Sequence, residues 1–154
     1  MTKLSSKFGF NDAIRTKTFE IKGNKFTVKV PTSNEKLAID KSIIEIDETE
    51  LNIRYQKMTE VFRQSVAESP IEGIELKEDD VIIDGMSAKE TVASVLRMEK
   101  RILKYFQMLI PEDGSSEDFT YEDIEAELPL QLQLEVVEKI SEAIEPSYRD
   151  ARKN

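Results

Sequence analysis

One stretch of this chain, from Ser87 to Ile110, constrains the fold more than any other. Its apolar residues recur at steps of three and four, which is the spacing of one face of an α-helix. Ser87 and Glu90 have the spacing of a capping box, and Pro111 ends the pattern because proline cannot continue a helix. A second apolar stripe runs beside the first, so the apolar arc is wider than one packed neighbour needs. The sequence therefore predicts a central helix over residues 87–110. Its arc is either buried on two sides or partly kept for a partner.

A β-hairpin is the clearest local prediction, over residues 17–30 with the sequence KTFEIKGNKFTVKV. Four apolar residues alternate with polar ones and would share a face: Phe19, Ile21, Phe26 and Val28. Gly23 and Asn24 tolerate positive φ and predict a two-residue turn. That turn would place Ile21 opposite Phe26, and Phe19 opposite Val28. Because a two-stranded ribbon is marginal in water, either its apolar face packs on a helix or its edge accepts another strand. Strand-edge self-association through these residues is one such solution.

The remaining elements follow from helix starts, apolar stripes and breakers. Residues 1–16 are expected to form a loosely ordered arm and residues 147–154 a polar tail, flanking a single globular domain over 17–146. Further helices are expected at about 34–46, 48–68, 120–128 and 129–145. One helix over 34–68 stays open, but a bend near Asp47 is favoured. Residues 81–83 fit a short strand or a buried turn. The predicted fold class is α+β, mainly α, with an N-terminal antiparallel β-hairpin packed on a small bundle of amphipathic helices.

Composition argues against several function classes. The chain has no Cys and no His, which removes the best nucleophile, the commonest general base and the usual zinc ligands. We therefore expect no enzymatic activity and no cofactor. Asp79, Asp80 and Asp84 suggest calcium, but they lack the alternating ligands of an EF-hand loop, and a solvated connector is favoured.

The charge distribution bears on partners and location. The net charge is −9, with a basic excess confined to the first 31 residues, so we expect no nucleic-acid binding. No apolar run is long enough to span a membrane and no signal-peptide core is evident, so we expect a cytoplasmic protein.

The order of these parts resembles that of a known family. A basic hairpin, KTFEIKGNKFTVKVPT, leads into SNEKLAIDKSI; an acidic middle precedes the long amphipathic helix, and a helix beginning LPLQLQLEVVEKI comes last. This arrangement, over roughly residues 17–146, resembles the tail assembly chaperones of long-tailed bacteriophages and prophages of Gram-positive bacteria. The resemblance is strongest at Val30-Pro31-Thr32.

The resemblance implies a non-enzymatic helper. Such chaperones bind the tape measure protein, a long helical chain, and keep it soluble while tail tube protein polymerises around it. They coat this client in multiple copies, act in the host cytoplasm and are absent from the mature virion. An adaptable apolar surface suits such a client. The expected client-binding residues are Met98, Tyr105, Phe106, Met108 and Leu109. Tyr105 and Met108 are expected at the edge of the arc, and burial in the core is the alternative, above all for Phe106.

Two other function classes stay open: a structural tail component, or a small acidic adaptor or inhibitor that binds another protein. Members of the resembled family are also made in a longer, frameshifted form. Arg152-Lys153-Asn154 would fit the slippery codons for such an event. The genes beside this one would discriminate between the classes.

Overall fold

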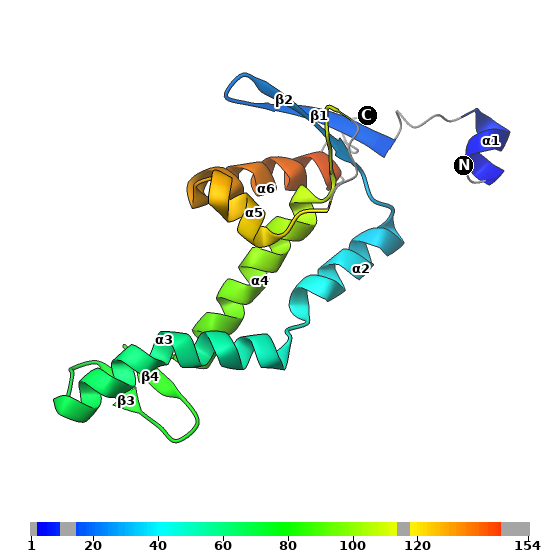
Figure 1. The fold of residues 1–154 in the computed structure, drawn as a ribbon. Helices are drawn as coiled ribbons and strands as arrows, with labels where there is room; N and C mark the ends of the chain where they lie inside the picture. Colours follow the sequence, from blue (N-terminus) through cyan, green and yellow to red (C-terminus); the bar gives the residue numbers. More distant parts are fainter. Residues whose placement is uncertain (1–2, 10–14, 114–117, 146–154) are drawn as a thin grey trace. The chain divides into compact units, whose positions relative to one another are not determined.

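The computed structural model describes residues 3–9, 15–113 and 118–145 and has an α+β fold that is mainly helical, as the sequence predicted (Figure 1). Internal contacts divide the chain into two compact units. Unit 1 comprises Met1–Asp40 and Arg101–Asn154, and unit 2 comprises Lys41–Lys100. The sequence predicted one body over residues 17–146, and the structure divides these residues between two.

Unit 1 contains the hairpin and the C-terminal helices. Its elements are α1 (Lys3–Phe8), β1 (Thr16–Ile21), β2 (Asn24–Lys29), β6 (Leu109–Ile110), α5 (Tyr121–Glu127), α6 (Leu130–Ile144), the first part of α2 (Ser33–Ile44) and the end of α4 (Ala88–Phe106). The strands form an antiparallel sheet in the order β1-β2-β6. Helix α6, orange in Figure 1, packs against β1 and β2. Both solutions for the hairpin are therefore realised, since a helix covers it and the outer edge of β2 accepts a strand.

The N-terminal arm is more ordered than expected at two places. Residues Lys3–Phe8 form α1, and Arg15 is tied to the folded part of unit 1. The Arg15 guanidinium donates to both Glu35 carboxylate oxygens at 2.9 and 3.0 Å, and the Val30 amide donates to the Arg15 carbonyl at 2.6 Å. The predicted tail, including Arg152–Asn154, lies outside the described residues.

The hairpin turn is of the predicted kind but is displaced by one residue. Lys22 and Gly23 occupy its two central positions with φ of 49° and 82°, and Ile21 pairs with Asn24. Positive φ at both central residues is the requirement of a type I′ turn. The expectation that Gly23 and Asn24 form the turn is therefore wrong by one position.

Cross-strand pairing explains this displacement. In the observed register Phe19 lies opposite Phe26 with ring centroids 5.5 Å apart, and Glu20 lies opposite Lys25. The expected register would have placed Lys22 against Lys25, and like charges directly opposite destabilise a sheet. The shift preserves side-chain parity, so the four predicted apolar residues still share one face.

The central helix is shorter than predicted. Helix α4 ends at Phe106, and Leu109–Ile110 form β6 instead of a last helical turn. The Lys29 amide donates to the Met108 carbonyl at 2.9 Å, which places this segment against β2. Pairing satisfies backbone groups on the edge of β2, and this gain overrides the helical period of the side chains.

The buried residues of unit 1 come from the sheet and from α4, α5 and α6. They include Ile21, Val28, Ile102, Tyr105, Phe106, Met108, Tyr121, Ile124, Val136, Val137, Ile140 and Ile144. Leu130 and Leu134 of α6 are exposed, whereas Gln133 of the same helix is buried.

Unit 2 is built on two helices and a second small sheet. Its elements are the end of α2, α3 (Glu48–Glu68), β3 (Ile74–Leu76), β4 (Val81–Ile83), β5 (Met86–Ser87) and most of α4. The antiparallel sheet has the order β3-β4-β5, and α3 packs against β3. The core consists of Tyr55, Val81, Ala88, Val92 and Leu96, with Ile46, Leu51, Met58, Ile74 and Ile83 packed around them. The favoured prediction of two helices with a break near Asp47 is confirmed, and of the two alternatives for residues 81–83 the structure has the strand.

Candidate functional site

The predicted client-binding residues are largely buried. Tyr105, Phe106 and Met108 expose only 2%, 9% and 8% of their surface in unit 1. Leu109 is half-buried there in β6, and Met98 is half-buried in unit 2. The expectation that Tyr105 and Met108 stand at an exposed edge of the helix is therefore wrong. Of the two alternatives for the arc, burial in the core is the one that the structure shows at Tyr105, Phe106 and Met108.

Long cationic side chains lie over the Tyr105 ring. Lys36 Nζ lies 5.8 Å and Arg101 Cζ 4.9 Å from the ring centroid, within the range of cation–π attraction. Lys36 also donates to Asp40 at 2.7 Å. Burial alone would lower the pKa of Lys36, but the Asp40 carboxylate and the Tyr105 side chain outweigh this and raise the pKa. These contacts fix Tyr105 as a structural residue of unit 1.

The predicted strand-edge residues share one face of the hairpin. Ile21 and Val28 are buried, whereas Phe19 and Phe26 are half-buried and stacked with an interplanar angle of 19°. The outer edge of β2 is occupied by β6. In the described part of this sheet, the outer edges of β1 and of the two-residue strand β6 are left for another strand.

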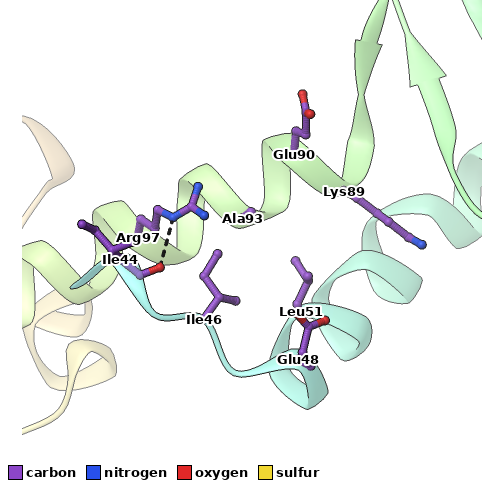
Figure 2. Close-up of a pocket in the computed structure, with 8 residues that line it drawn as sticks. All are labelled: Ile44, Ile46, Glu48, Leu51, Lys89, Glu90, Ala93 and Arg97. Atoms are coloured by element: carbon purple, nitrogen blue, oxygen red, sulfur yellow. Dashed lines mark hydrogen bonds between the residues drawn. The ribbon is translucent and has the colours of Figure 1, made fainter. Parts of the chain in front are cut away.

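An open groove with an apolar floor lies on the surface of unit 2. It has a volume of about 370 Å³ and is lined by Ile44, Ile46, Glu48, Leu51, Lys89, Glu90, Ala93 and Arg97. Figure 2 shows Ile46 and Leu51 pointing toward the face of α4 that carries Ala93. Ile44 is 65% exposed, and both Ile46 and Leu51 rest on the core beneath. The floor is aliphatic and the rim carries two acids and two bases.

Hydrogen bonds at the ends of α2 and α3 hold this groove open. Asp47 caps α3 by accepting from the Thr49 and Glu50 amides at 2.8 and 3.3 Å. At the other side, Arg97 Nε donates to the Ile44 carbonyl at 3.4 Å, which Figure 2 marks with a dashed line. Lys100 Nζ donates to the Glu45 carbonyl at 3.1 Å. Cations near the last carbonyls of a helix satisfy these acceptors and favour its dipole.

An aliphatic groove of this kind can bind apolar side chains from a partner helix. The mixed charges of its rim can pair with polar residues that flank such side chains. The sequence does mark the start of α3 beside the groove, because Asp47 is followed by Glu50 three residues later. The groove itself was not predicted from the sequence. What the sequence could not show is that Ile44 and Ile46, at the break between the helices, are brought beside α4.

Asp80, one of the three acidic residues considered for calcium, has a structural role. Asp80 accepts hydrogen bonds from the Ser87 hydroxyl and from the Val81 and Lys89 amides, the amides at 2.7 and 3.2 Å. Burial would raise the pKa of Asp80, but these bonds outweigh it and lower the pKa. The Ser87 hydroxyl in turn accepts from the Glu90 amide at 3.2 Å, as the predicted cap requires. Asp80 therefore fastens the start of α4.

Within residues 3–9, 15–113 and 118–145, no group of three or more acidic side chains is placed to hold a metal ion. No helix in these ranges combines the length and apolar character needed to cross a bilayer.

Comparison with known proteins yielded no relative. No protein family, no curated protein and no solved structure matches this chain.

Proposed function

We propose that this chain is a phage tail assembly chaperone that binds the tape measure protein and keeps it soluble while the tail tube assembles. The proposal joins the sequence resemblance over the hairpin and the following helix to one structural observation, the open apolar groove in unit 2. The client surface proposed here is therefore this groove, and not the residues of α4 and the segment after it that the sequence suggested.

The groove suits an amphipathic helical client. Such a helix projects aliphatic side chains at steps of three and four, and the exposed Ile44 with the floor residues Ile46 and Leu51 offers matching apolar surface. A net charge of −9 on each bound copy would keep a coated client soluble by mutual repulsion. The protein would then work in the host cytoplasm in several copies per client and leave before the virion matures.

Co-expression tests the client site directly. A candidate tape measure protein, sought as a very long helical chain among the products of the neighbouring genes, is expressed with the wild-type chain or with Ile44→Asp, and its soluble fraction is measured. The expected result is a soluble client with wild type and loss of most of that solubility with the variant, since a carboxylate in the groove opposes apolar docking.

Val61→Asp is the matched control. Val61 has the same 65% exposure and lies in unit 2 on α3, but it does not line the groove. If both variants solubilise the client equally well, the groove is not the client site. If wild type solubilises no client, or if the chain is found by mass spectrometry in purified tails, the chaperone proposal itself is wrong.

A further inference from the structure

Strand β1 is the longest edge strand of the described residues. It spans six residues, Thr16–Ile21, and β2 is its only strand partner among the residues that the structure describes. The other edge strands, β3, β5 and β6, have only three, two and two residues, and Pro111 follows β6 directly. Proteins usually blunt their edges by short strands, prolines or bulges. β1 contains no proline and pairs without interruption along its length.

The observed ladder shows which backbone groups of β1 point outward. The Val30 amide donates to the Arg15 carbonyl, so these two residues form a hydrogen-bonded pair. Such pairs alternate along an antiparallel ladder, which directs the backbone of Lys17, Phe19 and Ile21 toward β2. The amides and carbonyls of Thr18 and Glu20 point to the outer edge.

We propose that β1 pairs in antiparallel fashion with β1 of a second copy of this chain, across a two-fold axis at Phe19. Thr18 of each copy then forms a hydrogen-bonded pair with Glu20 of the other. The two Phe19 residues face each other in a non-hydrogen-bonded pair, where side chains approach most closely. Because Phe19 already stacks on Phe26, the result is a row of four aromatic rings across a six-stranded sheet.

The side chains of β1 select this register over its neighbours. A two-fold axis perpendicular to the sheet keeps each side chain on its own face, so only pairs of equal parity are allowed. An axis at Lys17 would oppose two lysines, and an axis at Glu20 would oppose two glutamates. An axis at Thr18 would place Lys17 against Phe19 of the second copy. Only the axis at Phe19 avoids like charges and gains an aromatic pair, which makes the strand complementary to itself.

Cysteine cross-linking tests the pairing, and it is clean because the chain has no cysteine of its own. Thr18→Cys and Glu20→Cys are made as separate variants, both at exposed positions. Opposed residues of a hydrogen-bonded pair have Cα atoms about 5.5 Å apart, which suits a disulfide. After mixing and oxidation, the heterodimer of the two variants is expected to exceed either homodimer at least several-fold. Little cross-linking in the mixture, or a dominant Thr18→Cys homodimer, would overturn the proposed register.

A proline variant tests whether the edge itself carries the association. Thr18→Pro removes an outward amide and leaves the β1–β2 ladder intact, whereas Thr18→Val keeps the amide. Light scattering at high concentration should show dimer for wild type and Thr18→Val, and monomer for Thr18→Pro. A monomeric wild type, or a dimeric proline variant, would refute the pairing. Neither experiment involves a client, so the result is independent of the chaperone function.

Discussion

The Gly73 carbonyl accepts a hydrogen bond from the Asp84 amide at 2.7 Å, and the Asp84 carboxylate fills the space where a side chain at position 73 would lie. Gly73 has φ of +85°, a conformation that residues with a side chain rarely adopt. This contact joins the residue before β3 to the turn after β4. It therefore fixes the start of the small sheet of unit 2 by a requirement that only glycine meets.

We expect Gly73→Ala to destabilise unit 2 by about 1–2 kcal/mol through its φ, and by a small further amount because the Asp84 carboxylate, at the end of an exposed side chain, must move away from the new methyl group. Gly85→Ala is the control, since Gly85 has a similar φ of +81° with nothing near its added methyl group. It should cost only the conformational term of about 1–2 kcal/mol. Amide hydrogen exchange in β4 would measure the loss of stability in both variants. Equal losses would show that Asp84 does not close the space above Gly73.

Much of the fold could be predicted because local signals were strong. The helix break near Asp47 was readable from four polar residues between two apolar stripes, and Asp47 does cap α3. The hairpin was readable from period-two alternation. Its exact turn was not, because Lys22-Gly23 and Gly23-Asn24 both suit a primed turn and cross-strand pairing decided between them. Asp84-Gly85 was a missed signal, for this dipeptide forms the two-residue turn between β4 and β5.

The candidate site was harder to predict for a physical reason. Periodicity shows which residues of α4 share a face, but it does not show which neighbour covers that face. Lys36 of α2 lies over the Tyr105 ring, and the Met108 carbonyl accepts a hydrogen bond from Lys29 of β2, so both contacts come from elements distant in sequence. Ile46 keeps the helical spacing of Ile39 and Ile43, but this spacing does not mark a residue as part of a groove.

Asp80 should contribute stability that disappears in acid. Its pKa is lowered from the ordinary value of 3.8 by hydrogen bonds to the start of α4, so the contribution is complete above about pH 4. It is lost as the pH falls through the lowered folded-state pKa. We expect Asp80→Ala to lower the free energy of unfolding by about 1–3 kcal/mol at pH 7. Urea titrations of wild type and Asp80→Ala measure this difference in the free energy of unfolding. It should be smaller at pH 3 than at pH 7.

Asp79→Ala is the control for that measurement, because Asp79 is exposed and adjacent. Its effect should stay within about 0.5 kcal/mol at both pH values. If the two variants behave alike, Asp80 does not fasten α4.

Burial of Tyr105 and Met108 reverses the outcome expected of a surface site. Tyr105→Asp and Met108→Asp each place a carboxylate in the core of unit 1 and should destabilise it by about 4 kcal/mol or more. Ile44→Asp, at a 65% exposed position, should leave the helical circular dichroism and the melting temperature nearly unchanged. Thermal melts of the three variants measure the contrast. If the Tyr105 variant melts like the wild type, Tyr105 is a surface residue and not part of the core of unit 1.

Gln133 offers the sharpest test of the C-terminal helices, because it is a polar side chain only 1% exposed. Its Nε2 donates to the Leu128 carbonyl at the end of α5 at 2.8 Å, and its Oε1 accepts from the Tyr121 hydroxyl at 3.2 Å. Gln133→Ala removes both bonds and leaves a cavity, so we expect a loss of about 2–4 kcal/mol in the free energy of unfolding. Gln133→Met keeps the side-chain volume, so it should recover the part of this loss that comes from the cavity. The part that comes from the two lost hydrogen bonds should remain.

Gln131→Ala serves as the matched control, since Gln131 is exposed on the same helix and its loss should cost less than about 0.5 kcal/mol. Urea denaturation of the full chain, followed by hydrogen exchange in α5 and α6, gives all three values. A double-mutant cycle with Tyr121→Phe then isolates the Tyr121–Gln133 bond, and a coupling of about 0.5–1.5 kcal/mol is expected. If Gln133→Ala costs no more than Gln131→Ala, the junction of α5 and α6 is held by its apolar residues alone. The buried amide would then have no share in setting how α6 follows α5.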